Sequence, residues 1–291
     1  MRIAGRFISI YLFAFIFLIW TIVPIYWLLS LSLMSQSERM VNPTPLYPRN
    51  PTFLNYARIL GISMKDGDGV VQVPSGNSKA ALRGLRNSAV VATIVTIITM
   101  VVALPSAYSL GRLKFRFRNS LLFGIIACRS LPDMAMLIPF FILFQVLGMQ
   151  GTLAGIVILH FASITPIIVW VLMTIFEVLP KSVEREARID GCNRSQAFWR
   201  VIVPMALPGI ISALSFTWMI SWNEFTYGLF IGGGSEAGTY PPILSALLAV
   251  DYGLADYQAA SAAMVIGLLP SVVLAFVYQR QMRSLNVVSP F

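Results

Sequence analysis

The sequence has few charged residues. Only 11% of its 291 residues are Asp, Glu, Lys or Arg, whereas hydrophobic residues make up 57%. A soluble globular domain is about 25% charged, so this composition, with a mean hydropathy of +0.77, excludes an ordinary soluble protein. The apolar runs are long and continuous rather than alternating, which favours membrane-spanning helices over a β-barrel.

Residues that carry covalent or metal chemistry are also scarce. The chain has one histidine, His160, and two cysteines, Cys128 in an apolar segment and Cys192 in a charged one. A disulfide framework, a metal site and the catalytic set of a membrane enzyme are therefore not indicated. The dipeptide Gly-Lys is absent, which excludes a Walker A phosphate loop, so ATP that drives this protein must be bound by another chain.

What the sequence does have is six apolar segments, each long enough to span a membrane as a helix. They lie at approximately 9–33, 87–110, 119–147, 153–176, 206–230 and 257–279. The first is too long for a signal peptide and is predicted to be retained. We therefore expect an all-α polytopic membrane protein that forms one membrane domain over 1–291. Its expected parts are 1–33 (N-terminus and first helix), 34–86 (outer loop), 87–280 (core helices) and 281–291 (tail).

Basic residues indicate the orientation of these spans. Thirteen of the 21 Lys and Arg residues fall in the N-terminus, the C-terminal tail and the segments after the second and fourth spans. Cytoplasmic segments attract Lys and Arg, so both termini are predicted to be cytoplasmic. Most of the +9 net charge then reflects topology, and nucleic-acid binding is not expected. In the outer loop, the Pro-rich start at 43–51 predicts an extended chain, and "DGDG" at 66–69 predicts a turn.

The densest charge lies between the fourth and fifth spans, in "PKSVEREARIDGCNRSQAFWRVIVPMALPG". "SVEREARI" predicts a short helix with Ser182 as a possible N-cap, and "DGCNRS" predicts a turn at Gly191. "SQAFWRVIV" predicts a second helix with Ser195 as a possible cap. The charges alone are compatible with a solvated cytoplasmic loop. Phe198 and Trp199 are unusual in such a loop and favour a docking element instead.

The same stretch resembles the EAA loop of binding-protein-dependent ABC importer permeases. The matching positions are Glu184, Ala187, Asp190, Gly191, Phe198, Ile202, Pro204 and Pro208. The sequence departs from the family pattern at Arg185, Glu186, Cys192 and Val203. Residues 86–93, 131–157 and 221–231 also resemble segments of the maltose-type carbohydrate permeases.

This resemblance implies a type I ABC importer (MetI-like) permease fold that moves a di- or oligosaccharide across the cytoplasmic membrane of a bacterium or archaeon. It implies that the loop 177–205 couples the permease to a cytoplasmic ATPase, and that ATP and Mg²⁺ are bound there. The implied coupling residues are Glu184, Glu186, Ala187, Asp190, Gly191, Phe198 and Pro204. The implied partners are a second homologous permease subunit, two copies of the ABC ATPase, and a periplasmic or lipid-anchored substrate-binding protein.

Ionisable residues inside a span usually face a cavity or a partner. In the third span, Arg129 and Asp133 are four residues apart, which would place them on one helix face. They are predicted to form either a structural ion pair or a polar lining of the substrate path.

In the fifth span, "SWNEF" supplies Trp222, Asn223 and Glu224. Trp can stack on a sugar while Asn and Glu bond its hydroxyl groups. Successive helical residues point in different directions, so at least one of the three is expected to make an inter-helix contact instead.

Other features favour packing. Two Gly-x-x-x-Gly pairs, Gly151 with Gly155 and Gly228 with Gly232, fit close helix contacts, and His160 is expected to be a hydrogen-bonded helix residue. Two alternatives stay open from the sequence. The substrate could be a polyol or a glycerol-phosphate compound, or the protein could be an ATP-independent secondary transporter, although no internal repeat supports the latter.

Overall fold

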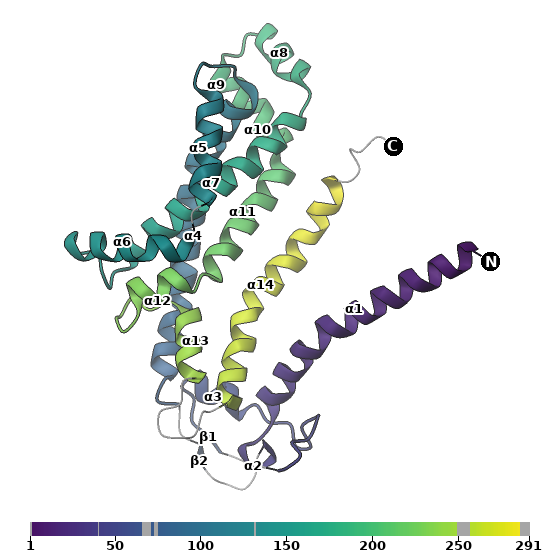
Figure 1. The fold of residues 1–291 in the computed structure, drawn as a ribbon, viewed down its shortest axis with the longest axis vertical. Coiled ribbons are helices and arrows are strands. Elements are labelled where there is room, and N and C mark those ends of the chain that lie inside the picture. The colour runs from purple at the N-terminus through teal and green to yellow at the C-terminus, as the bar shows by residue number, and fades with distance from the viewer. Residues whose placement is uncertain are drawn as a thin grey trace. The chain divides into compact units, whose positions relative to one another are not determined.

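The protein is described here by a computed structural model, which covers residues 2–39, 41–65, 71–72, 75–130, 132–248 and 257–285 (Figure 1). These residues are mainly helical. The helices are α1 (Arg2–Leu33), α2 (Gln36–Arg39), α3 (Leu54–Ile59), α4 (Ser78–Arg112), α5 (Arg118–Ser130), α6 (Asp133–Val146), α7 (Leu153–Val178), α8 (Lys181–Ile189), α9 (Arg194–Ala197), the π-helix η1 (Phe198–Ile202), α10 (Val203–Met205), α11 (Leu207–Trp222), α12 (Thr226–Gly232), α13 (Tyr240–Leu248) and α14 (Tyr257–Leu285). A two-stranded antiparallel hairpin pairs β1 (Met64–Lys65) with β2 (Val71–Gln72).

Four of the predicted spans are confirmed as continuous helices. In the described part of the chain, the helices that are long and apolar enough to cross a membrane are Ile10–Leu33 of α1, α4, α7 and Tyr257–Gln279 of α14. They match the first, second, fourth and sixth predicted segments, and α4 begins nine residues before the predicted start at 87. The apolar window of α1 buries none of its residues within the chain, as expected for a helix surrounded by lipid or a partner.

The third predicted span is divided into two shorter apolar helices. α5 ends at Ser130 and α6 begins at Asp133, with Pro132 in an extended conformation between them. Proline disfavours helical geometry in the residue before it and cannot donate to the preceding turn, so the helix breaks here. The prediction that Arg129 and Asp133 share one face of a continuous helix is therefore wrong. Their side chains lie outside the described part of the structure.

The fifth predicted span also contains breaks. The helical segment Arg194–Met205 meets Leu207–Trp222 at an angle of 79°. α11 then ends at Trp222, and α12 begins only at Thr226. The polar sequence "SWNEF" thus lies at a helix end rather than inside a continuous helix, and three residues interrupt the predicted segment 206–230.

The outer loop is more structured than its sequence suggests. Residues 41–53, which include the Pro-rich start, form neither helix nor strand and contain several bends, so they are not one extended segment. The remainder holds α3, the β1–β2 hairpin and the first turns of α4. The predicted turn at 66–69 lies outside the described residues.

The contacts divide the chain into two compact units. The first comprises Met1–Leu82 and Ile243–Leu269. In it, the side-chain amide of the buried Asn55 donates hydrogen bonds of 2.9 Å to the carbonyl groups of Ser32 and Met34. These bonds satisfy carbonyls at the end of α1 and hold α3 against it.

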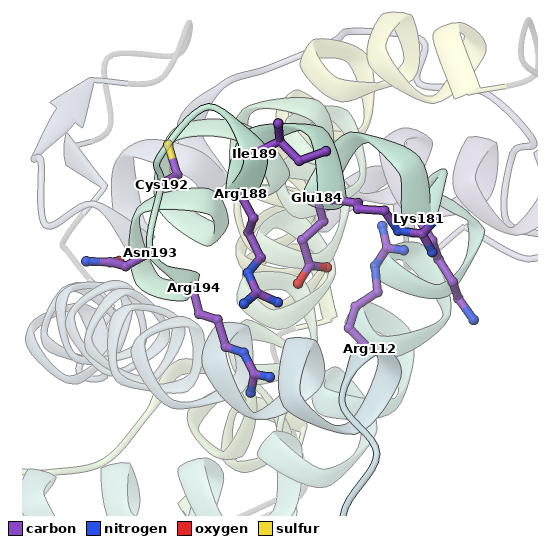
Figure 2. A pocket seen from close by; sticks show the side chains of 9 residues that line it. Arg112, Lys181, Glu184, Arg188, Ile189, Cys192, Asn193 and Arg194 are labelled. Carbon is purple, nitrogen blue, oxygen red and sulfur yellow. The ribbon is translucent and has the colours of Figure 1, made fainter.

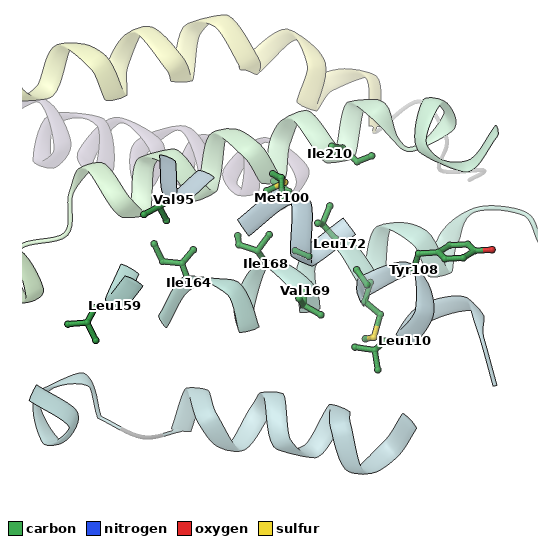
Figure 3. Close-up of a cluster of buried hydrophobic side chains, with 14 of the residues drawn as sticks. Val95, Met100, Tyr108, Leu110, Leu159, Ile164, Ile168, Val169, Leu172 and Ile210 are labelled. Atoms are coloured by element: carbon green, nitrogen blue, oxygen red, sulfur yellow. The ribbon is translucent and has the colours of Figure 1, made fainter. Parts of the chain in front are cut away.

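The second unit comprises Arg83–Pro242 and Pro270–Phe291, and it contains both candidate sites. Figure 3 shows its hydrophobic core, in which α4, α7 and α11 contribute Met100, Ile168 and Ile210, respectively. The predicted glycine contacts are confirmed between α7 and α12. A Cβ atom at Gly155 would lie 3.2 Å from the side chain of Ile231, and one at Gly232 would lie 2.8 Å from that of Ile156. Only glycine allows this approach of the two helices.

Candidate functional site

The first candidate site is the charged loop that α8 begins. Pro180 is the N-cap of α8, so Ser182 lies inside the helix and the prediction that it caps the helix is wrong. Ala187 is the buried residue of α8, and Glu184 is half-buried, whereas Glu186 is exposed. The hydroxyl group of Tyr108, in the last turns of α4, donates a hydrogen bond of 2.7 Å to Oε1 of Glu184. One face of α8 is therefore fixed to the end of α4.

A glycine turn closes α8. Gly191 has a φ of +90°, a conformation that costs other L-residues free energy. Its N–H donates to the carbonyl of Arg188 at 3.3 Å, and the Cys192 N–H donates to that of Ala187 at 3.0 Å. These two bonds form a Schellman motif, which explains why the sequence needs glycine after Asp190. The side chain of Asp190 is exposed and forms no hydrogen bond with the residues that the structure describes.

The next helix is capped by Asn193. Its side chain accepts from the Gln196 N–H at 2.8 Å, and the Gln196 side chain accepts from the Asn193 N–H at 2.9 Å. This is a capping box, and it leaves Ser195 inside α9, contrary to the prediction from sequence. The pattern Asn-x-x-Gln at 193–196 is the feature of the sequence that indicates this capping box. The capping box fixes the exit angle of the turn, so α8 and α9 are held by two successive caps.

Phe198 anchors the loop to the core. Its side chain is buried, and its ring lies 4.7 Å from that of Tyr108 and 6.1 Å from that of Phe176 on α7. It begins the π-helix η1, a form that is frequent at functional sites. Pro204 follows in the short helix α10, just before the 79° bend into α11. The structure thus packs Glu184, Ala187 and Phe198 against the rest of the helical unit. The side chains of Glu186 and Asp190 are exposed on the surface.

The second candidate site is the break between α11 and α12. Asn223 is exposed there, and its side chain donates to the Met219 carbonyl at 2.8 Å. Trp222 is buried and stacks on Trp218, with ring centroids 5.0 Å apart. Asn223 also donates a long hydrogen bond of 3.5 Å to Oγ of Ser271 on α14, so its side chain is exposed but bonded on one side.

Glu224 has a different environment. Its carboxylate accepts hydrogen bonds from the backbone N–H groups of Tyr227 (2.9 and 3.1 Å) and Gly228 (3.1 Å) at the start of α12. It also lies 3.1 Å from Nε2 of the buried His160, whose Nδ1 lies 2.8 Å from Oγ of Ser221. This confirms that His160 is a hydrogen-bonded helix residue. No local sequence pattern indicates its partners, because Glu224 is 64 residues away.

The fold and the loop agree with comparisons to known proteins. Residues 103–286 match the family described as "Binding-protein-dependent transport system inner membrane component". The chain is 27% identical over 261 residues to the sulfoquinovosyl glycerol transport system permease protein SmoH of Agrobacterium fabrum (90% of this chain, 85% of the relative). It is 30% identical over 259 residues to a probable ABC transporter permease protein of Pyrococcus horikoshii (87% of each). It is 24% identical over 262 residues to the trehalose transport system permease protein SugB of Mycobacterium tuberculosis (90% and 89%).

Solved structures show the same fold. A chain from the crystal structure of a bacterial ABC transporter involved in import of the acidic polysaccharide alginate aligns with a TM-score of 0.76 and 21% identity, over 96% of both chains. A chain of the inward-facing methionine transporter MetNI aligns with a TM-score of 0.58 and 19% identity, over 72% of this chain and 98% of that one. Because the family match covers well over half of the sequence, the chain belongs to the binding-protein-dependent transport system inner membrane components and is a multi-pass permease subunit of an ABC importer in the cytoplasmic membrane.

Proposed function

We propose that this permease subunit moves a di- or oligosaccharide into the cell. Support comes from relatives named for transport of sulfoquinovosyl glycerol, trehalose and diacetylchitobiose, all of which contain sugar units. The first of these also contains glycerol, so a polyol or a glycerol-phosphate compound is the second candidate substrate class. An ATP-independent secondary transporter is disfavoured by membership of a family whose members work with a binding protein.

The observation that best supports the coupling role is that α8 has one exposed face and one face bonded to α4. Its outward residues Glu186 and Asp190 are exposed, while Glu184 is bonded to α4 through Tyr108. A partner that moves the outward face must therefore move the end of α4, and Phe198 transmits the same motion to α7. We assign the partner as a cytoplasmic ABC ATPase, which binds the ATP and Mg²⁺.

The complete transporter would contain four membrane or ATPase subunits and a binding protein. Two copies of the ATPase would dock on this chain and on a second homologous permease subunit, one on each. A periplasmic or lipid-anchored binding protein would deliver the substrate from outside. This permease itself would catalyse no covalent step.

We place the substrate path at the two helix breaks. Non-helical backbone at membrane depth is tolerated where it is buried in protein or lines a water-filled cavity. One break follows Trp222 and exposes Asn223, which supplies an amide for sugar hydroxyl groups. The other lies between α5 and α6, where Arg129 and Asp133 flank Pro132. Trp222 and Glu224 would support the first break rather than contact the substrate.

Reconstitution into liposomes tests this function. The chain is combined with the paired permease, the ATPase and the binding protein encoded beside it, and uptake of labelled trehalose, maltose, glycerol and glycerol 3-phosphate is compared. We expect uptake of a disaccharide that requires ATP. Uptake of only glycerol or glycerol 3-phosphate would select the second substrate class, and uptake that persists without ATP would contradict the coupling role.

A further inference from the structure

A basic pocket of about 580 Å³ lies beside α8 (Figure 2). Helix α8, the end of α4 and the start of α9 each contribute to its lining. Its charged residues are Arg112, Lys181, Glu184, Arg185, Arg188 and Arg194. Figure 2 shows the side chains of Arg188 and Arg194 directed toward the space that Glu184 also faces. Cations from three separate elements thus converge on one cavity.

The positive charge of this pocket is not balanced by the residues that the structure describes. Five cations surround one carboxylate, and that carboxylate already accepts a hydrogen bond from Tyr108. None of the five forms a salt bridge with a residue that the structure describes. Like charges held this close repel one another, so an anion in the pocket would stabilise the arrangement.

Arg112 provides a second, independent observation. Its Nε and Nη1 atoms are buried and have no hydrogen-bond partner among the described residues. Its Nη2 atom donates only a long bond, 3.4 Å, to the Pro180 carbonyl. An unpaired charged donor is costly to bury. A small rotation of the side chain toward an acceptor in the pocket would satisfy it.

The geometry of α8 separates this pocket from the face assigned to the ATPase. At 100° per residue, Lys181, Glu184, Arg185 and Arg188 form one stripe along the helix. Glu186 lies on the opposite side of the helix, and Asp190 is the C-cap residue that follows the helix and does not line the pocket. An ATPase docked on that side would leave the basic stripe facing the end of α4.

We propose that the pocket binds a phosphate group, supplied either by a soluble phosphate compound or by the headgroup of an anionic lipid. Guanidinium groups match the geometry of phosphate oxygens, and several of them can share one phosphate. The pocket is larger than one carboxylate group. A single carboxylate would also neutralise only one of the five positive charges that line it. The bound phosphate would link α8 to α4 and restrain the coupling loop, a consequence that rests on the proposed function. Phosphate binding itself does not depend on the proposed function.

Binding is measured on the full-length chain in nanodiscs of phosphatidylcholine, without ATPase subunits. Sodium phosphate is titrated by calorimetry, and a parallel sample with added phosphatidylglycerol is examined by native mass spectrometry for retained lipid. The test variant is the double substitution Arg188→Gln and Arg194→Gln. The control is Arg200→Gln, an exposed arginine of η1 outside the pocket. Matching unfolding midpoints of the three proteins show that each is folded.

We expect the double substitution to weaken phosphate binding, or phosphatidylglycerol retention, by about tenfold or more, and Arg200→Gln to leave both within about twofold. Binding of phosphate alone identifies a soluble ligand, and retention of phosphatidylglycerol alone identifies a lipid; either result supports the pocket. The inference is overturned if neither probe binds, or if the double substitution changes nothing. It is also overturned if the double variant binds both probes as the wild type does but, in a separate pull-down with the purified ATPase, loses its association with that subunit, since the pocket then receives an acidic protein surface. Because no ATPase is present in the binding assay, failure of the coupling role leaves this result unaffected.

Discussion

The hydroxyl group of Tyr108 donates a 2.7 Å hydrogen bond to Oε1 of Glu184, and this bond joins the end of α4 to α8. The ring of Phe198 packs 4.7 Å from the same tyrosine. The loop 177–205, which we propose couples to the ATPase, is therefore held at Tyr108 by a polar contact and an aromatic contact together. Motion of α8 without motion of α4 would break the polar contact, and motion of η1 without motion of α4 would break the aromatic contact.

Tyr108→Phe separates these two contacts. The ring remains for Phe198, but the half-buried Glu184 loses its donor. A hydrogen bond to a charged group contributes about 1.5–3 kcal/mol when buried, and less at a partly exposed site. We expect substrate-stimulated ATP hydrolysis by the reconstituted transporter to fall several-fold while membrane insertion is unchanged. Tyr47→Phe, an exposed tyrosine of the outer loop, is the control. Wild-type stimulation in Tyr108→Phe would show that the bond carries no coupling.

Asp190→Lys tests the outward face of the loop. The carboxylate is exposed and makes no described side-chain contact, so the substitution should not disturb folding. It reverses a charge where we place the ATPase, and like charges at an interface cost affinity. We expect normal insertion and loss of stimulated ATP hydrolysis, measured with the ATPase at fixed concentration. Ser195→Lys, which adds a cation at another exposed position of the loop, should retain most of the stimulation. Full stimulation in Asp190→Lys would contradict docking at this face.

Gly191→Ala tests the turn itself. A Cβ atom there would meet no other atom within 4 Å, so the only cost is the φ of +90°, about 1–2 kcal/mol. The end of α8 should open more often, by a factor of about five or more. Hydrogen–deuterium exchange of the α8 amides measures this directly. Gly124→Ala in α5 has equal space and no positive φ, and it should leave that exchange unchanged.

The sequence predicts local features well and tertiary partners poorly. The four continuous spans and the turn at Gly191 follow from apolar length and from glycine chemistry, both of which can be read directly from the sequence. Pro132 is visible in the sequence, but whether it kinks or breaks a helix depends on the packing around it. The contact between His160 and Glu224 joins residues that are distant in the sequence, so no local pattern indicates it. For that reason the sequence indicates Glu224 only as a candidate substrate contact, and its hydrogen bonds to the first turn of α12 emerge only from the structure.

The pairing of His160 with Glu224 can be measured by a double-mutant cycle. Glu224→Ala removes the acceptor for the first N–H groups of α12 and leaves Nε2 of His160 without its partner, while Nδ1 keeps its bond to Ser221. This should cost about 2–3 kcal/mol of unfolding free energy. His160→Ala removes the other side of the pair. We expect the double variant to be less destabilised than the sum of the single variants by about 1 kcal/mol. Detergent-titrated unfolding, followed by tryptophan fluorescence, provides the energies, and strict additivity would show that the two residues are not coupled.

Asn223→Ala is the matched variant at the same break. Its exposed side chain bonds to a carbonyl of its own helix and, at 3.5 Å, to Ser271 on α14, and both bonds are open to solvent. Its loss should therefore change the unfolding free energy by less than about 0.5 kcal/mol. If Asn223 lines the substrate path, uptake of the transported sugar should nevertheless fall. Unchanged uptake would remove Asn223 from the path, while the His160–Glu224 result would stand.

Gly228 on α12 faces Thr239, and the hydroxyl oxygen of Thr239 is buried without a described partner. A Cβ atom at position 228 would overlap that oxygen, so Gly228→Ala should destabilise the protein by about 1–3 kcal/mol. Thr239→Ala should cost little, because it removes a buried hydroxyl group that has no hydrogen bond. The remaining neighbours of the new Cβ would then lie at 3.2 Å and beyond, so Thr239→Ala should restore most of the stability lost in Gly228→Ala. Thr239→Val keeps a methyl group where the oxygen was and should not rescue. Rescue by valine, or none by alanine, measured by the same detergent titration, would show that the close approach of Gly228 and Thr239 does not determine the packing of α12.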